Sequence, residues 1–344
     1  MIHSEMPQDA RNSSIGAVIV AYNTGVDLIS CVESLRRQTG GSPHIVVVDN
    51  RSTDDTMALF RAWAARAEAE TGQPVLSDDP AAGPGRVILL DSGFNRGFAG
   101  GVNVGLAALA SIPSIRHFWI LNPDAWADEG AAQAILRAAE ATPGYGLIGG
   151  RVCYAETPPR IQMDGGTLNR WTGVTGNAHL GLAPESVQVT AASDVAFISG
   201  ASMVASRRFY EQVGPMREDY FLYYEEVDWA MRRGDLPMVV AEGFLVWHHA
   251  GTAIGSPTLE RLASPFSFWF KYRSRMKFMW RFNPLGLPVA IAYATAKAGQ
   301  LALKGAWPQV GALLRAVYGL PAPKPVRDRL SPEAARMAFG RGPR

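Results

Sequence analysis

The sequence contains little cysteine. Only Cys31 and Cys153 occur among its 344 residues. Neither has a second cysteine or a histidine at metal-ligand spacing, which argues against a disulfide framework and against a zinc knuckle. This usage favours a reducing compartment, so we expect a cytoplasmic protein.

Strong charge of either sign is also missing. The chain has 33 Lys and Arg against 31 Asp and Glu, and its basic residues form no long run. A nucleic-acid partner is therefore not expected. With 47% hydrophobic residues, the chain can bury a full core, which argues against overall disorder.

No stretch is apolar enough for a signal peptide or a membrane span. The first 14 residues are polar and include acids, and the most apolar late segment, 284–303, holds Lys297, Gln300, two prolines and two glycines. A spanning helix needs about 20 apolar residues. Contact with the inner face of the cell membrane remains open.

The first half alternates β-branched runs with amphipathic stretches, the pattern of βαβ units around a parallel sheet. The expected strands are 15–21, 44–49, 86–90 and 117–121, and the expected helices include 27–38, one that Asp54 caps, one opening at 97–101, and 131–141. After residue 150 the alternation weakens, and aromatic and basic residues interleave over 266–282.

These patterns divide the chain into four segments. We expect a flexible N-terminus at 1–14 and one α/β domain at 15–260, with a first half at 15–125 and a second half at 126–260. A helical aromatic-basic extension follows at 261–322, then a flexible tail at 323–344.

Polar residues follow three of the expected strands. They are Ala21-Tyr22-Asn23, the run from Asp49 to Asp54, and Asn122-Pro123-Asp124. Each alone could be a turn former or a helix cap. Ligands of open parallel sheets gather at the carboxyl ends of strands, so together these residues predict one cleft.

Five motifs occur in a specific order: VAYN, VDNRSTDDT, NRGFAGGVNVGL, LNPDA and FLYYEEVDWAMR. The set resembles family 2 glycosyltransferases, and the rhamnosyltransferase-like branch in particular, over residues 15–255. The resemblance implies an α/β GT-A type, Rossmann-like fold whose mostly parallel sheet is flanked by helices. It also implies an inverting, metal-dependent sugar transfer.

The same resemblance makes 15–260 the catalytic domain, with 15–125 as its nucleotide-sugar half and 126–260 as its acceptor half. It also assigns residues to the nucleotide sugar. These are Ala21, Tyr22, Asn23, Asp49, Asn95, Gly97, Asn103, Asn122 and Asp124. A carboxylate such as Asp49 can accept hydrogen bonds from a pyrimidine N3–H or from hydroxyls. The glycines at 97–101 either let the backbone approach the donor or serve close helix–sheet packing.

The resemblance further implies a Mg²⁺ or Mn²⁺ ion held by Asp124 and His248, with His249 as the alternative ligand. Such hard cations prefer oxygen ligands and can also accept an imidazole. Asn122 stands where other members have an acid, so we expect weak metal binding without the nucleotide.

The acids Glu225, Glu226 and Asp228 are clustered, which is unfavourable unless a cation, a helix N-terminus or proton transfer uses them. Glu226 matches the position of the family's catalytic base but is one methylene longer, so Asp228 is a rival. Each acid could instead cap a helix or pair with Arg232 or Arg233.

By this resemblance the donor is dTDP-rhamnose and the acceptor a polysaccharide or polyprenyl-linked glycan. A UDP-sugar-dependent transferase (galactofuranose or hexose) and a non-catalytic nucleotide-sugar-binding scaffold are the alternatives. A nicotinamide-dependent dehydrogenase is disfavoured, because no G-x-G-x-x-G turn follows the first strand.

Membrane contact through 266–282 and the helix that follows it is a further expectation. Trp269, Phe278 and Trp280 could sit at the headgroups beside lysines and arginines. Alternatively, these aromatic residues pack the extension onto the catalytic domain.

Overall fold

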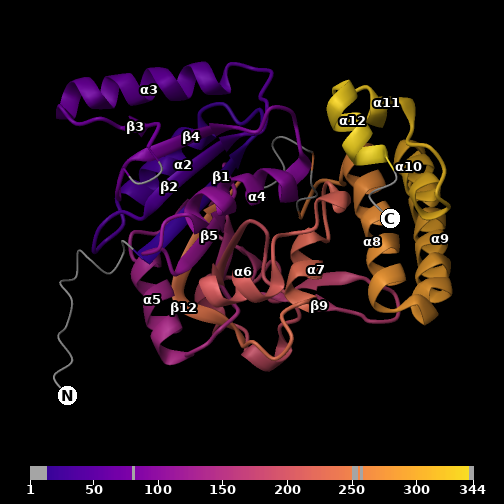
Figure 1. Cartoon of the computed structure of the whole chain (residues 1–344). Coiled ribbons are helices and arrows are strands. Elements are labelled where there is room, and N and C mark those ends of the chain that lie inside the picture. The colour runs from indigo at the N-terminus through magenta and orange to yellow at the C-terminus, as the bar shows by residue number, and fades with distance from the viewer. Residues whose placement is uncertain (1–13, 80–81, 250–254, 256–258, 341–344) are drawn as a thin grey trace.

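The computed structural model describes residues 14–79, 82–249, 255 and 259–340. The flexible N-terminus expected at 1–14 lies outside the described residues except for Ser14, as do residues 341–344 of the expected tail. A central sheet with helices on both faces fills most of the described chain (Figure 1).

Four parallel strands begin the sheet: β1 (Ile15–Ala21), β2 (His44–Asp49), β4 (Val87–Asp91) and β5 (His117–Leu121). Their bounds match the expected ranges closely, because each is a buried run rich in β-branched or aromatic residues. The full order is β3 (Leu76–Ser77), β4, β2, β1, β5, β11 (Ser202–Ser206), β7 (Leu147–Tyr154), β12 (Met238–His248) and β6 (Ala125–Ala127), with β8 (Ile161–Met163) paired to β7. The expected GT-A type, mostly parallel sheet is thereby confirmed.

The other strands complete the same sheet. The remaining strands are β3 (Leu76–Ser77), β6 (Ala125–Ala127), β7 (Leu147–Tyr154), β8 (Ile161–Met163), β11 (Ser202–Ser206) and β12 (Met238–His248), and a separate hairpin holds β9 (Gly166–Leu168) and β10 (Thr175–Asn177). Strand β11 runs antiparallel between β5 and β7. The expected donor and acceptor halves therefore share one continuous sheet.

Alternating residues of β1 face opposite sides, as strand geometry requires. Ala17 and Ile19 pack with α2 (Asp27–Arg36), α3 (Thr56–Thr71) and α5 (Ala131–Ala141). Val18 and Val20 pack with α4 (Gly97–Ala110), in the cluster that also includes residues of α6 (Arg207–Val213) and α7 (Glu225–Met231). Short 3₁₀ turns lie at Pro184–Ser186, Ala192–Asp194, Glu218–Tyr220 and Pro284–Gly286.

Two glycines of α4 lie directly against β1. A Cβ at Gly101 would come within 2.5 Å of Val20, and one at Gly105 within 2.4 Å of Val18. Both side chains are branched and buried on a strand, so they have little room to move. These glycines serve close helix–sheet packing.

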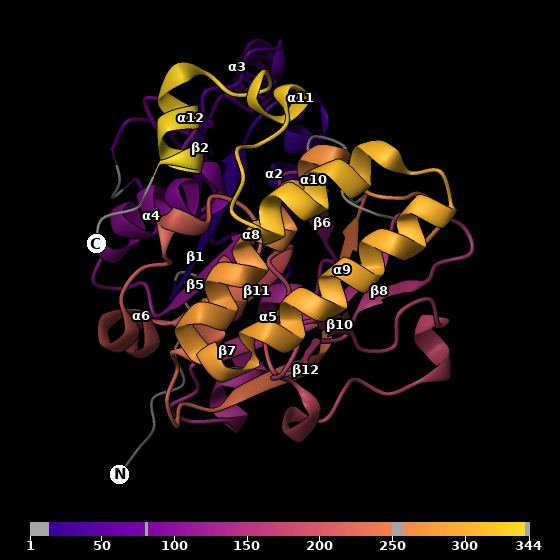
Figure 2. The same cartoon turned by 90° about the vertical axis from the view of Figure 1, so that its right-hand side faces the viewer.

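The C-terminal extension is helical, as expected: α8 (Pro265–Phe282), α9 (Leu287–Leu303) and α10 (Trp307–Val317). It continues into α11 (Lys324–Arg327) and α12 (Pro332–Phe339), which lie above α8 (Figures 1 and 2). Val326, Ala334 and Ala338 are fully buried in this helical cluster. The expectation of a flexible tail is therefore wrong for 323–339, because small apolar side chains bury these two short helices.

Most aromatic residues of α8 are buried. Trp269 is 3% exposed and Phe278 2%, whereas Trp280 is 66% exposed. Trp269 packs edge-on against Phe270 and Phe339. The membrane contact expected for Trp269 and Phe278 is thus contradicted, and packing explains them. Among the described residues, no helix is both long and apolar enough to cross a membrane.

Candidate active site

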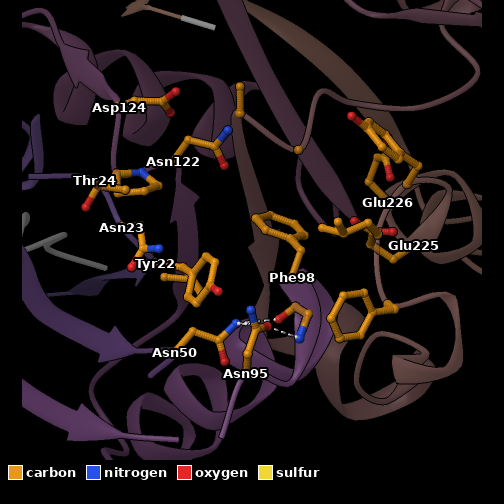
Figure 3. Close-up of a pocket in the computed structure, with 18 of the residues that line it drawn as sticks. Tyr22, Asn23, Thr24, Asn50, Asn95, Phe98, Asn122, Asp124, Glu225 and Glu226 are labelled. Atoms are coloured by element: carbon orange, nitrogen blue, oxygen red, sulfur yellow. Dashed lines mark hydrogen bonds between the residues drawn. The ribbon is translucent and has the colours of Figure 1, made fainter. Parts of the chain in front are cut away.

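A cavity of about 490 Å³ opens where β1, β2 and β5 end. The predicted residues that line it are Tyr22, Asn23, Asn95, Gly97, Asn122, Asp124, Glu226 and His248. Asp124 and Asn122 lie on one side of the cavity, and Glu225 and Glu226 lie on the other (Figure 3). The polar strand ends thus meet at one cleft, as the sequence predicts.

Three predicted binding residues do not line this cavity. Ala21 is fully buried in the core on the α2 side of the sheet. Asp49 Oδ1 accepts a hydrogen bond from the Ser52 N–H, which shapes the turn after β2. The Asn103 amide pairs with the Met216 backbone in both directions and donates to Glu218. Asn103 lies in the second turn of α4, so its side chain fixes a neighbouring loop.

Asn50 organises the donor side of the cavity. Its Oδ1 accepts from the Arg96 N–H at 2.9 Å and from the Ser92 hydroxyl at 3.1 Å. Its Nδ2 donates to the Gly97 carbonyl at 2.9 Å and to Asn95 Oδ1 at 3.2 Å. The end of β2 is thereby tied to the loop before α4. The sequence analysis placed Asn50 at a strand end but did not assign it to the site.

Asp124 and His248 face each other across a short gap. Asp124 Oδ1 lies 3.0 Å from His248 Nε2, and Asn122 Nδ2 lies 3.3 Å from the same nitrogen. Gln162 Oε1 lies 2.8 Å from His248 Nδ1. With Nδ1–H donating to Gln162, Nε2 presents its lone pair to the carboxylate. Either a proton or a cation between the two atoms would stabilise this pair.

The Asp124–His248 geometry fits a divalent ion. Two ligand atoms 3.0 Å apart, each about 2.1 Å from a shared ion, subtend an angle of about 90°, as in octahedral coordination. The Gln162 contact matches the way metal-bound histidines are oriented through their second nitrogen. Within the described ranges no group of three or more His, Cys, Asp or Glu could hold a metal, so further ligands would come from substrate and water.

His249 does not join this pair. Its Nδ1 lies 3.3 Å from Asp27 Oδ1, and its ring meets Trp126 edge-on. Its backbone N–H donates to the Asp124 carbonyl, which braces the loop that carries the carboxylate. The structure therefore brings His248, and not the alternative His249, to Asp124.

Glu225 and Glu226 begin α7 and both line the cavity. Burial, followed by the neighbouring Glu226 charge, raises the pKa of Glu225 well above its usual value, and its Oε2 has no hydrogen-bond partner in the described structure. Burial also raises the pKa of Glu226, while Lys271 opposes that rise. Glu226 is only partly buried and reaches the cavity, as a proton acceptor must.

Asp228 does not reach the cavity. It is fully buried, with Oδ1 2.7 Å from Arg232 Nε and Oδ2 accepting from the Tyr220 hydroxyl at 2.9 Å. Arg217 approaches the same carboxylate at 3.7 Å. Asp228, the alternative base, is thus part of a structural ion pair. The residue lies two positions beyond Glu226 on a helix, which turns its side chain away from the neighbouring acid.

The loop before α7 has an unusual backbone. Phe221, Tyr223 and Tyr224 all have φ between 66° and 72°, a region costly for residues other than glycine and common at functional sites. Gly97 is required beside it, because a Cβ there would lie 2.2 Å from the Phe221 carbonyl oxygen. The Phe98 N–H donates to that oxygen at 2.9 Å.

Helix α8 holds this loop in place. The Ser274 hydroxyl donates to the Leu222 carbonyl at 2.8 Å, the Tyr223 hydroxyl pairs with Ser267, and Phe221 stacks on Phe270. The C-terminal extension therefore supports the position of Glu226 and is not simply appended after residue 260.

The sequence analysis missed several lining residues. They are Val20, Thr24, Asn50, Thr53, Phe98, Pro123, Gln162, Met163, Asn177, Ser199, Gly200, Ala201, Phe221, Leu222, Tyr223, Phe266, Arg329 and Leu330. Arg329 lies just after α11, with its guanidinium 4.5 Å from the centre of the Phe266 ring. No local pattern marks a residue some 200 positions from the strand ends, so only the packing of α11 and α12 reveals it.

This architecture is that of the GT-A fold. The structure aligns with GalNAc-T7, solved with UDP, GalNAc and Mn²⁺, at a TM-score of 0.56 and 12% identity, covering 83% of this chain and 51% of that one. It aligns with mannosyltransferase PcManGT from Pyrobaculum calidifontis, in complex with GDP-Man and Mn²⁺, at a TM-score of 0.50 and 15% identity, covering 92% and 89%. At these identities the likeness establishes the fold.

The profile of the family described as glycosyl transferase family 2 matches residues 17–213. The chain belongs to this family. It is 26% identical, over 65% of its length, to the low-salt glycan biosynthesis hexosyltransferase Agl10 of Haloferax volcanii, of which the match spans 63%. It is also 26% identical to the N-acetylglucosaminyl-diphospho-decaprenol L-rhamnosyltransferase of Mycobacterium tuberculosis, over 72% of this chain and 80% of that protein.

Proposed function

We propose that this protein is an inverting, metal-dependent glycosyltransferase that acts on a lipid-linked or polysaccharide acceptor. The observation that carries the proposal is the division of one cavity. A metal-compatible pair, Asp124 and His248, lies on one side, and a carboxylate at the start of α7, Glu226, lies on the other (Figure 3).

The proposed donor side is built from Asp124, His248 and Asn122. A Mg²⁺ or Mn²⁺ ion bound there would neutralise the charge that develops on the departing diphosphate. Asp124 supplies an oxygen ligand, and Gln162 holds the His248 ring so that Nε2 faces the same point. With two protein ligands only, metal affinity should rise sharply when a nucleoside diphosphate adds its own oxygens.

On the acceptor side, Glu226 takes the proton of the attacking hydroxyl. The acceptor oxygen forms its bond to the anomeric carbon as the bond to the diphosphate breaks on the opposite face, which inverts the anomeric centre. A base must lie within hydrogen-bond reach of that hydroxyl and be ionised. Lys271 opposes the rise of the Glu226 pKa caused by burial, and so favours the ionised form.

For the donor we propose dTDP-rhamnose, supported by the resemblance to the mycobacterial rhamnosyltransferase. UDP-galactofuranose and UDP-hexoses are the alternatives, because the Haloferax relative is named only as a hexosyltransferase. Released nucleoside diphosphate should be measured with dTDP-rhamnose, UDP-galactofuranose, UDP-galactose and UDP-N-acetylglucosamine, with and without Mn²⁺. Turnover with a UDP-sugar alone would replace the rhamnose proposal.

A non-catalytic nucleotide-sugar-binding scaffold remains the second candidate. It would bind nucleotides in a metal-dependent way but release no diphosphate with any donor and acceptor. The partly buried Glu226 on the cavity wall favours the enzyme, because a scaffold has no use for a costly acid there.

We further propose peripheral membrane contact through α9. This helix is the outermost of the C-terminal helices in both views (Figures 1 and 2). Its outer side and flanks expose Leu285 (83%), Val289 (46%), Tyr293 (44%), Leu303 (91%) and Trp307 (65%). Apolar residues recurring at helical spacing, with lysines alongside at 297 and 304, are typical of a helix lying in a membrane interface.

The contact is tested by flotation with liposomes containing anionic lipid. Leu303→Glu should lower the floated fraction, because it places a charge at the most exposed apolar position of this surface. Leu182→Glu is the control, since Leu182 is an exposed leucine (44%) in the loop after β10 and outside the C-terminal helices. Equal flotation of the two variants, or none of the unmodified protein at low salt, would refute the contact.

A further inference from the structure

Two cations of α8 (Pro265–Phe282), near the proposed base, form no close ion pair with a carboxylate among the described residues. Lys271 and Arg275 are four residues apart on α8, so they share one side of the helix. Neither is within 4.0 Å of an acidic oxygen in the described part of the chain, unlike their neighbours Lys277 and Arg281, which pair with Asp219. This half of α8 therefore carries positive charge that the protein does not neutralise.

Burial of the charge costs more free energy at Arg275 than at Lys271. Arg275 is only 4% exposed, and its Nε and Nη2 have no hydrogen-bond partner among the described residues. Its guanidinium lies 4.3 Å from the ring centre of Tyr272 and 5.5 Å from that of Tyr293. Aromatic faces offset part of the cost of a buried cation, but a buried charge is ordinarily paired. An anion bound nearby would offset the remaining cost of burying this charge.

Lys271 is the cation that a ligand can reach. Its side chain is exposed, and it interacts electrostatically with both Glu226 and Arg275. Tyr224, just before Glu226, donates through its hydroxyl to the Gly173 carbonyl, and a Cβ at Gly173 would lie 3.1 Å from Arg275 Cγ. The loop between β9 and β10 therefore covers Arg275, while β10 ends at Asn177 on the cavity wall.

These contacts place the two cations on the acceptor side. Lys271 interacts electrostatically with Glu226, the group proposed to act on the acceptor hydroxyl, whereas the diphosphate of the donor belongs beside Asp124 and His248 across the cavity (Figure 3). Tyr293, which contacts Arg275, also belongs to the exposed apolar surface of α9. A molecule with a sugar at Glu226, an anionic group at Lys271 and an apolar chain along α9 would match this order of surfaces.

We propose that Lys271, with Arg275 behind it, forms a binding site for the diphosphate of a lipid-linked acceptor. This inference rests on the proposed function and narrows its acceptor class to sugars carried on a prenyl diphosphate. Lys271 donates directly to a phosphate oxygen, and Arg275 raises the local positive potential. Both act in binding, and Glu226 remains the base.

A second explanation for Lys271 predicts different kinetics. If Lys271 served only to keep Glu226 ionised, its loss would lower the rate constant with every acceptor and would be recovered at higher pH. If it binds the acceptor diphosphate, its loss raises KM only for acceptors that carry that group. The comparison of two acceptors therefore separates the two roles.

The test uses the full chain in detergent with two acceptors of one sugar. They are N-acetylglucosaminyl diphosphate on a short prenyl chain and the neutral octyl glycoside of N-acetylglucosamine. In Lys271→Gln we expect KM for the diphosphate acceptor to rise roughly 10- to 100-fold, the loss that corresponds to one charge-assisted hydrogen bond. KM for the octyl glycoside and for the donor should not change.

Two further variants complete the experiment. Lys271→Arg should restore most of the diphosphate affinity, because it keeps the charge. Arg66→Gln, an exposed position on α3, removes the same charge far from the cavity and should behave as the unmodified protein. A similar rise in KM for both acceptors in Lys271→Gln, or an unchanged KM for both, would overturn the diphosphate site. Absence of transfer to either acceptor by the unmodified protein would instead refute the proposed function.

Discussion

Replacement of Glu226 by glutamine tests the proposed chemistry most directly. The substitution keeps the size of the side chain and its place on the cavity wall but removes the proton acceptor. Loss of one general base typically lowers the rate about 10²- to 10⁴-fold. We expect kcat to fall within that range while KM for the donor stays nearly constant, because the proposed donor site at Asp124 lies on the opposite side of the cavity from Glu226 (Figure 3).

The pH dependence gives a second signature. Burial raises the pKa of Glu226 above 4.5, and the base must be ionised to accept a proton. The acidic limb of kcat/KM should therefore lie above pH 4.5, and activity should fall as pH drops through that limb. In Glu226→Gln this limb should disappear from the residual activity, because no carboxyl then titrates at the reacting hydroxyl.

Asp228→Asn is the matched comparison. Asp228 is fully buried, and its carboxylate pairs with Arg232 at 2.7 Å. A hydrogen bond to a charged group contributes about 1.5–3 kcal/mol, and Arg232 is 17% exposed, so we expect a loss near the lower end of that range.

The assay pairs steady-state kinetics with thermal unfolding for both variants. Asp228→Asn should lower the melting temperature by a few degrees and leave kcat largely intact. Glu226→Gln should lower kcat and leave the melting temperature unchanged or higher. The opposite outcome, with near-normal turnover in Glu226→Gln and loss of turnover in a folded Asp228→Asn, would refute the assignment of the base.

Three other substitutions test separate parts of the structure. Asp124→Ala should abolish Mn²⁺-dependent turnover with unchanged circular dichroism, and normal Mn²⁺ titration of its activity would remove Asp124 from the metal site. Glu225→Gln should raise the melting temperature at pH 8 more than at pH 4.5. Burial raises the folded-state pKa of Glu225, so the unmodified protein loses stability as pH rises from the pKa of the unfolded-state glutamate, near 4.5. Equal shifts of the melting temperature at both pH values would contradict this reasoning. Gly105→Ala should lower the free energy of unfolding, measured with urea, by about 1–3 kcal/mol through overpacking against Val18. A gain in stability, as is typical of a Gly→Ala change in a helix, would contradict the close packing.

The sequence by itself determined the sheet and the place of the cleft. The strands at 15–21, 44–49 and 117–121 have the bounds that their apolar runs predict. Polar residues directly after those strands lie at one cavity, because parallel strands bring their carboxyl ends to the same edge. These patterns are local in the sequence. A local pattern predicts the folded structure correctly when a short buried run can form only a strand.

Only the tertiary structure decided which polar residues face the cavity. Asp228 and Asn103 belong to the same motifs as Glu226 and Asn95, but helix geometry turns the first pair toward Arg232 and Met216. A helix rotates about 100° per residue, so neighbours in a motif point in different directions.

The contributions of α8, α11 and α12 were likewise decided by packing. Ser274 holds the loop before Glu226, and Arg329 reaches the cavity wall from beyond α11. The aromatic residues of 266–282 could have faced lipid or core, since composition alone does not distinguish the two. Contacts between segments far apart in the chain depend on how the helices pack, and no short window of sequence contains that information.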